Sequence, residues 1–201
     1  MRTAVFMGSP RVKGNTQLLL EEAMRGASEQ GAQITFFELN SMKIRGCQDC
    51  GGCAKSGVCV KKDDMEQIYP VIRQCSRFIL ASPIFFVGVS AQAKAMIDRC
   101  QCFWYEKYIL KRPIAQGPYG RAGLFLSVGG MGGIEGKNCS EATARAFFRT
   151  ISVPEHQTLG YLGVDAKGDI LKQPQALKEA YEAGRKLLDM PGGKKEQGGR
   201  L

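Results

Sequence analysis

Segments with strand character alternate with segments of helical spacing along this chain, and this alternation constrains the fold more than any other feature. The strand-like segments are apolar and β-rich, and they cover residues 3–8, 33–39, 77–81, 123–128 and 158–164. Apolar residues recur at helical spacing over residues 15–29, 64–74, 90–99, 140–150 and 174–190. Strands that alternate with helices form a parallel sheet with helices on both faces. We therefore expect an α/β fold with a doubly wound, five-stranded parallel sheet.

Two insertions depart from this alternation. Residues 41–63 carry a run of cysteines, and residues 101–121 carry five aromatic residues, namely Phe103, Trp104, Tyr105, Tyr108 and Tyr119. The aromatic insertion could cover a flat ligand or form a subunit interface, and we favour the interface. We expect residues 1–190 to form a single domain that includes the cysteine loop, and residues 191–201, which are rich in Gly and Lys, to form a flexible tail.

The loop after the first strand has the features of a phosphate-binding turn. In parallel sheets, ligands bind where the strands end, and this loop reads GSPRVKGNT directly before a helix. Backbone N–H groups at a helix N-terminus attract phosphate, and the loop lacks the glycine patterns of nucleoside triphosphate and dinucleotide sites. We therefore expect one terminal phosphate here, the alternative being an ordinary glycine-rich turn before a capped helix. The candidate residues are Ser9, Arg11, Gly14, Asn15 and Thr16.

The loops after the third and fourth strands suit a flat ligand. The third strand continues into an apolar, partly aromatic stretch, which could hold a ring system or be continued core. The fourth is followed by glycines, which let a backbone approach a planar group closely, although a flexible loop has the same composition. A phosphate cradle, an apolar slot and a glycine-rich wall together form the shape of an FMN site. The candidates are Ser82, Pro83, Ile84, Phe85 and Phe86 after the third strand, and Gly129, Gly130 and Met131 after the fourth.

The cysteine run has the spacing C-x2-C-x2-C-x5-C and consists of Cys47, Cys50, Cys53 and Cys59. Thiolates are soft metal ligands, and bacterial ferredoxin runs begin with the same C-x2-C-x2-C pattern. We favour a [4Fe–4S] cluster. The alternatives are a structural zinc site, which usually joins two C-x2-C pairs across a longer spacer, and a loop that is empty or disulfide-bonded.

The other four cysteines are scattered along expected helices and strands, and we interpret Cys75, Cys100, Cys102 and Cys139 as buried small apolar residues. A reducing compartment fits this cysteine usage best.

Charge and hydropathy narrow the choice of partners. The net charge is +9, but the basic residues are dispersed and form no nucleic-acid module. A basic surface suits an anionic cofactor, a nicotinamide dinucleotide or an acidic electron carrier. The longest apolar stretch, residues 78–93, is interrupted by Ser82, Pro83, Gly88 and Ser90, so we expect no membrane span and no signal peptide. We expect a soluble, cytoplasmic protein that binds neither nucleic acid nor membrane.

The stretches that carry these features resemble the iron-sulfur flavoproteins, within the broader NADPH-dependent FMN reductase superfamily. They are GSPRVKGNT, GCQDCGGCAKSGVCVKKDDM and SPIFFVGVSAQAKAMIDR, at residues 8–16, 46–65 and 82–99. The resemblance implies a flavodoxin-like sheet with strand order 2-1-3-4-5, FMN in the three loops, and a [4Fe–4S] cluster on the four-cysteine run. It also implies a homodimer or homotetramer in which the cluster of one subunit lies near the flavin of its partner. One departure is Phe85, where relatives often carry tyrosine.

We therefore expect a flavin-dependent oxidoreductase that passes electrons from a ferredoxin-like donor or NAD(P)H to an acceptor such as oxygen, peroxide or a quinone. The cofactors would supply the chemistry, so we assign no catalytic side chain, and the single histidine, His156, belongs to no acid–base constellation. Three alternatives stay open: a cluster-free NAD(P)H-dependent FMN or quinone reductase, a non-enzymatic electron carrier, and a zinc-binding module without flavin.

Overall fold

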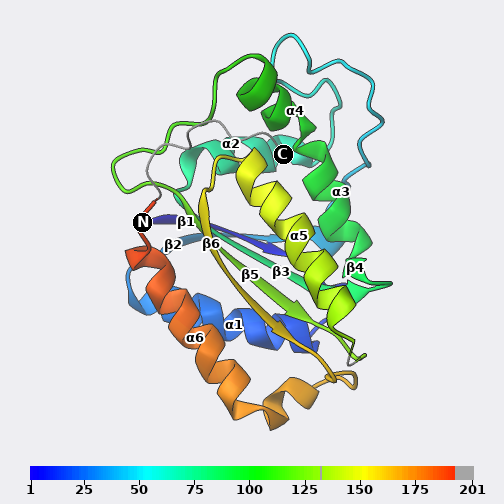
Figure 1. The fold of residues 1–201 in the computed structure, drawn as a ribbon, viewed down its shortest axis with the longest axis vertical. Helices are drawn as coiled ribbons and strands as arrows, with labels where there is room; N and C mark the ends of the chain where they lie inside the picture. The colour runs from blue at the N-terminus through cyan, green and yellow to red at the C-terminus, as the bar shows by residue number, and fades with distance from the viewer. Residues whose placement is uncertain (132, 193–201) are drawn as a thin grey trace.

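The computed structural model describes residues 1–131 and 133–192, which form an α/β fold around a parallel sheet (Figure 1). Its parallel strands are β1 (Arg2–Met7), β2 (Gln33–Glu38), β3 (Arg77–Phe85), β5 (Ala122–Val128) and β6 (Glu155–Tyr161). They lie in the order β2-β1-β3-β5-β6, which is the expected order 2-1-3-4-5 counted along the chain. A two-residue strand, β4 (Gly88–Val89), pairs antiparallel with the end of β3. The predicted fold class is confirmed.

Helices cover both faces of the sheet because successive residues of a strand point to opposite sides. One face carries α1 (Asn15–Glu29) and α6 (Pro174–Asp189), and the other carries α2 (Met65–Gln74), α3 (Ala91–Arg99) and α5 (Ile134–Thr150) (Figure 1). In β1, Ala4 and Phe6 join the core under α2, α3 and α5, whereas Val5 and Met7 join the core under α1 and α6. No helix in the described part of the chain has the length and apolar character of a membrane span.

The predicted bounds of three elements are wrong. The third strand was expected to end at residue 81, but β3 continues to Phe85, so Ser82–Phe85 belong to the strand and not to the loop after it. The strand expected at residues 158–164 is β6, which starts at Glu155. β6 lies at the edge of the sheet and its residues are mostly half-buried, so no apolar run marks its start. The helix expected from residue 140 is α5, which starts at Ile134. Glycine content predicts a loop there, but Gly136 belongs to the helix, and a Cβ built on it would lie 2.8 Å from Cγ2 of Ile84.

Three of the four scattered cysteines are buried, as predicted, namely Cys75, Cys100 and Cys102. The prediction is wrong for Cys139, which is exposed on the outward side of α5. Residues 193–201 of the predicted tail and Gly132 of the predicted glycine-rich loop lie outside the described residues.

The cysteine loop and the aromatic insertion lie next to each other (Figure 1). The aromatic insertion begins with the short helix α4 (Gln101–Trp104) and continues as a π-helical turn, η2 (Tyr105–Ile109). Further along it, Nη2 of Arg112 donates to the carbonyl oxygen of Ser56 over 2.9 Å. Two insertions that are far apart in sequence therefore support each other. The remaining short helical turns are η1 (Leu39–Ser41), after β2, and η3 (Asp169–Lys172), before α6.

Helices α1 and α6 approach each other at backbone distance because each contributes a glycine to their contact. A Cβ built on Gly26 would overlap the carbonyl oxygen of Tyr181, and one built on Gly184 would overlap the carbonyl oxygen of Ala23. The contact fixes the position of α1 on the sheet.

We expect Gly184→Ala to destabilise the protein, although alanine has a higher helix propensity than glycine, by about 1 kcal/mol in a helix interior. The added methyl group would meet a backbone carbonyl that cannot move without α1, and overpacking of this kind costs about 1–3 kcal/mol. Chemical denaturation should give a lower free energy of unfolding than for the wild type. The exposed change Lys186→Ala on the same helix should stay within about 0.5 kcal/mol, and an equal loss in both variants would contradict the packing explanation.

Candidate functional site

A cavity of about 610 Å³ opens where β1, β3, β5 and β6 end. Its walls come from the ends of these strands and from the loops after them, because the carboxyl ends of parallel strands meet at one edge of the sheet. The volume falls within the usual range for small-molecule sites, about 300–1,000 Å³.

All the predicted binding residues except Ser82 line this cavity: Ser9, Arg11, Gly14, Asn15, Thr16, Pro83, Ile84, Phe85, Phe86, Gly129, Gly130 and Met131. Ser82 is buried behind the wall. Its Oγ donates to the carbonyl oxygen of Pro83 over 2.8 Å and accepts the N–H of Ser90 over 2.9 Å. The structure therefore brings the three predicted segments together around one space. Ser82 supports the wall from behind through its hydrogen bonds.

A fourth wall, which sequence reasoning misses, follows β6 and includes Leu162, Val164 and Asp165. A strand placed at residues 158–164 hides Leu162 and Val164, whereas the observed end at Tyr161 marks them as strand-end residues. The other lining residues that were not predicted lie within or beside the expected loops: Val87, Val128, Gly133, Glu135 and Gly136.

The start of α1 forms the polar wall. Its N-cap residue is Gly14, which offers no side-chain cap. The first N–H groups of a helix have no intrahelical partner and favour an anion. The turn before the helix is shaped by the N–H of Arg11, which donates to Oγ of Ser9 over 3.2 Å. Arg11 also donates from Nη1 to the carbonyl oxygen of Asp165 over 3.2 Å. Its guanidinium therefore lies between the loop after β1 and the segment after β6.

The side chain of Asn15 is engaged elsewhere. Its Nδ2 donates to the carbonyl oxygen of Ala166 over 2.9 Å, and its Oδ1 accepts the N–H groups of Gly168 and Ile170 over 2.9 and 3.3 Å. It fastens the segment after β6 to the start of α1. Any contribution of Asn15 to an anion site would therefore come from its backbone N–H.

The apolar wall ends in a strained turn. Phe86 and Val87 connect β3 to β4, and both have a positive φ, 47° and 65°. Two-residue hairpin turns with a positive φ at both residues prefer Asn or Gly. A β-branched residue such as Val87 is an outlier at a positive φ. The turn leaves Phe86 fully exposed at the cavity rim. Strain of this kind clusters at ligand sites.

Glycines bring the remaining wall close to Ile84. A Cβ built on Gly129 would lie 3.2 Å from Cδ1 of Ile84, and one built on Gly130 would lie 2.5 Å from Oδ1 of Asp165. Side chains at these positions would narrow the cavity. The arrangement combines an anion-binding helix end with apolar and glycine surfaces.

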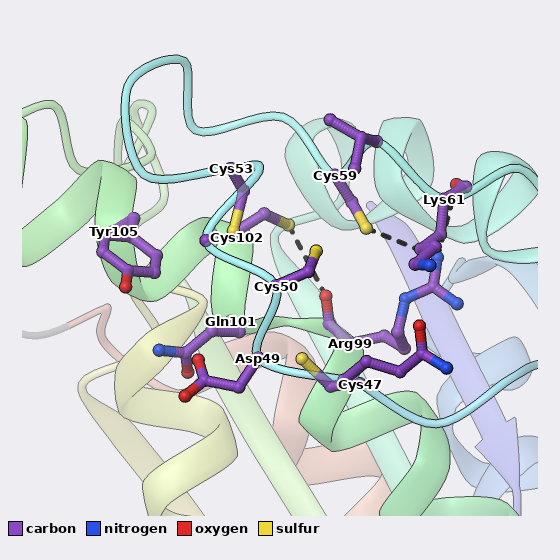
Figure 2. Close-up of a pocket in the computed structure, with 13 residues that line it drawn as sticks. Cys47, Asp49, Cys50, Cys53, Cys59, Lys61, Arg99, Gln101, Cys102 and Tyr105 are labelled. Atoms are coloured by element: carbon purple, nitrogen blue, oxygen red, sulfur yellow. Dashed lines mark hydrogen bonds between the residues drawn. The ribbon is translucent and has the colours of Figure 1, made fainter.

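The cysteine run forms a second, smaller site (Figure 2). Cys47, Cys50, Cys53 and Cys59 border one hollow of about 20 Å³, and Figure 2 shows their side chains around this space. All four are free thiols, two of them exposed and two half-buried. In residues 1–131 and 133–192, no three His, Cys, Asp or Glu side chains are arranged to hold a single metal ion. The thiols thus surround a space rather than converge on a point.

Arg99 lies behind these thiols and is almost completely buried. Its Nη1 donates to Oδ2 of Asp63 over 2.5 Å, and its Nη2 lies 3.5 Å from Sγ of Cys59. Burial raises the pKa of the Cys53 thiol. Burial acts on Cys59 as well, but hydrogen bonds from the Lys61 backbone and from Arg99 help to outweigh it, and the pKa of Cys59 is lowered.

The aromatic insertion contributes Gln101, Cys102 and Tyr105 to the same hollow. Tyr105 belongs to the π-helical turn η2, a conformation that occurs frequently at functional sites. Trp104 packs on Tyr105 and Tyr108, with ring centroids 5.4 and 5.6 Å apart. The insertion therefore borders the cysteine loop, and the predicted subunit interface stays a prediction.

Comparison with known proteins gives a consistent result. Residues 1–160 match the family described as NADPH-dependent FMN reductase. Two iron-sulfur flavoproteins of Archaeoglobus fulgidus are similar in sequence. One is 33% identical over 60% of this chain and 52% of its own length, and the other 37% identical over 61% of this chain and 59% of its own length. The matched part is thus less than two thirds of the length of these relatives.

The fold is also found among solved structures. An NAD(P)H:quinone oxidoreductase from Methanothermobacter marburgensis superposes with a TM-score of 0.70, and the match covers 93% of this chain and 96% of that chain. The identity is 19%, so the likeness concerns the fold alone.

The buried pair of Asp63 and Arg99 should make stability depend on pH. Burial alone would raise the pKa of the Asp63 carboxyl, but hydrogen bonds from Arg99 and from the N–H groups of Arg45 and Met65 hold this pKa below its ordinary value. A pKa that is lower in the folded than in the unfolded state stabilises the protein above the unfolded-state value. This stabilisation is lost as pH falls through the folded-state value.

We expect Asp63→Asn to lower the free energy of unfolding by about 3 kcal/mol at neutral pH, because it leaves a buried arginine without its carboxylate. The variant should also lose less stability than the wild type between about pH 5 and about pH 2. Denaturant titrations across this range measure both effects. Asp98→Asn, which removes an exposed ion pair with Lys94, should cost at most about 1 kcal/mol. Parallel pH profiles of Asp63→Asn and the wild type would refute the assignment.

Proposed function

The chain belongs to the NADPH-dependent FMN reductase family, and on this premise we propose that it is an FMN-dependent oxidoreductase. The observation that carries the proposal is the 610 Å³ cavity at the carboxyl edge of the sheet. It joins a helix N-terminus, which suits a phosphate, to apolar and glycine walls, which suit a flat ring system. FMN contains both groups in one molecule.

The cavity residues fit FMN by the surface that each wall offers. The start of α1 would hold the phosphate, with Ser9, Arg11, Gly14, Asn15 and Thr16. Pro83–Phe86 and Gly129–Met131 would hold the ring system, and Ser82 would brace the first of these stretches from behind. A Cβ on Gly129 would crowd Ile84, so the shape of the cradle depends on glycine at this position.

When bound, FMN supplies the redox chemistry, since a flavin exchanges one or two electrons. The chain has to bind it, orient it and limit its contact with water. The titratable side chains among the described residues of the cavity wall are Arg11, Glu135 and Asp165. The apolar residues Phe85, Phe86 and Val87 border the same space and would keep water from the ring.

We also propose that Cys47, Cys50, Cys53 and Cys59 hold a [4Fe–4S] cluster. Four free thiols on one loop border the same hollow, and thiolate sulfur is the ligand that such clusters require. The similarity to iron-sulfur flavoproteins supports the same assignment. The protein would then take electrons from a ferredoxin-like carrier or from NAD(P)H, and pass them to an acceptor such as oxygen, peroxide or a quinone.

A cluster-free NAD(P)H-dependent reductase of FMN or quinones is the second candidate. The observation that favours it is the match of residues 1–160 to the family described as NADPH-dependent FMN reductase, a description that names NADPH and FMN. In that case the cysteine loop would have a structural or thiol role.

We propose that the protein assembles as a homodimer or homotetramer. Phe86, Met131 and Ile134 are strongly exposed apolar side chains at or beside the rim of the cavity. Exposed apolar patches of this kind mark interaction surfaces.

The decisive experiment is purification without oxygen, followed by measurement of iron, acid-labile sulfide, zinc and flavin per chain. We expect one FMN with about four iron and about four sulfide. FMN without iron, together with fast NAD(P)H oxidation, would support the cluster-free reductase. FMN with the cluster but negligible turnover of small substrates would point to an electron carrier. Zinc without flavin would overturn the proposal.

We expect Arg11→Gln to weaken FMN binding about tenfold, because a charge-assisted hydrogen bond at a partly exposed site contributes about 1.5 kcal/mol. Flavin fluorescence titration of the apoprotein measures this change. Lys13→Gln is the matched control, because it removes a charge from the same loop at a position that does not line the cavity. Equal affinities of Arg11→Gln and the wild type would remove Arg11 from the phosphate site.

A further inference from the structure

Arg99 is a fully charged side chain that is only 1% exposed, and it lies at the last residue of α3. Burying a charge is costly unless it is paired and hydrogen-bonded. Its two terminal nitrogens bind different partners. Nη1 binds Oδ2 of Asp63 and the carbonyl oxygen of Arg45, at 2.5 and 2.9 Å. Nη2 binds Sγ of Cys59 and the carbonyl oxygen of Lys61, at 3.5 and 3.4 Å.

These partners stand at both ends of the cysteine loop. Arg45 comes two residues before Cys47, and Lys61 comes two residues after Cys59. One guanidinium therefore joins the entry of the loop to its exit. Closing a loop costs entropy. The hydrogen bonds of Arg99 offset this cost, because the side chain is attached to the end of a helix and so starts from a rigid position.

The arginine is itself held firmly. The carbonyl oxygen of Arg99 accepts the hydroxyl of Tyr69 over 3.1 Å and the thiol of Cys102 over 3.6 Å. A lysine could not replace it, because an ammonium is a single point charge, whereas the flat guanidinium presents donors in a fixed fork.

We propose that Arg99 is the positioning residue of the cysteine site: it sets the place of Cys59 and raises the reduction potential of the cluster bound there. The inference rests on the proposed cluster. Hydrogen bonds to cluster sulfurs are among the factors that set the potential. A donor on a ligand sulfur stabilises the more negative, reduced form, and Nη2 of Arg99 is such a donor.

Four proteins test the proposal: wild type, Arg99→Gln, Arg99→Lys and Arg112→Gln, each purified whole and without oxygen. Arg112→Gln is the matched control, since Arg112 also binds the cysteine loop, but at the carbonyl oxygen of Ser56 rather than at a sulfur. The first measurement is the midpoint potential of the cluster in a redox titration followed by EPR. The second is amide hydrogen exchange of residues 43–62 in the iron-free proteins.

We expect Arg99→Gln to shift the midpoint potential to more negative values and to speed exchange in the loop at least about tenfold, because charge-assisted hydrogen bonds are lost. The midpoint potential and the exchange rates of Arg99→Lys should lie between those of Arg99→Gln and those of the wild type. Arg112→Gln should keep the wild-type potential.

An unchanged potential in Arg99→Gln and Arg99→Lys would overturn the proposal, even if exchange became faster, because Arg99 would then act only as a structural support. If Arg99→Gln does not fold, the potential and exchange rates of Arg99→Lys are compared with those of the wild type instead. If the wild type contains FMN but no iron, the proposed cluster fails. The exchange measurement still decides whether Arg99 positions the loop, and wild-type exchange rates in both Arg99 variants would overturn that part too.

Discussion

The burial of the sheet on both faces determines where the rest of this protein lies. A parallel strand that is covered on both sides must be apolar throughout, and each connection must return across a face, here as a helix. All five parallel strands therefore end at the same edge, and the ends of β1, β3, β5 and β6 enclose a cavity together with the loops after them. The topology creates the site, and the side chains of the loops decide what it can bind.

Buried arginines perform a second task, which is to hold the irregular parts of the chain. Arg77, Arg99 and Arg121 are each 1% exposed. Arg77 donates to the carbonyl oxygens of Leu188 and Met190 where α6 ends. The last carbonyls of a helix lack intrahelical partners, and a guanidinium carries enough donors to serve several of them. Of these three, Arg99 is the one that also reaches a carboxylate and a sulfur, so the same device serves a candidate site.

The regular part of this fold could be predicted because its signals are local. The continuous apolar run of β3 and the helical spacing of α1 identify themselves within a dozen residues. The edge strand β6 is half-buried and starts with polar residues, so its boundary was displaced and the wall after it was missed. Arg99 gave no signal, because a basic residue in the last turn of a helix ordinarily faces solvent. Its partners lie between 36 and 54 positions earlier in the chain, and only the folded structure brings them together.

Helix α3 connects the two candidate sites. Its N-cap residue, Ser90, donates to the carbonyl oxygen of Gly8, the neighbour of the cavity residue Ser9, and its last residue, Arg99, binds the cysteine loop. Nine helical residues span about 14 Å, and the residues that line the two sites do not overlap. In one chain the two proposed cofactors would therefore lie at opposite ends of α3. A second copy that placed its cysteine loop over the exposed apolar rim of the cavity would shorten the path between them, so the proposals of two cofactors and of a homo-oligomer support each other. In a monomer, by contrast, the cysteine loop would be better placed to serve an external protein than the cavity of its own chain.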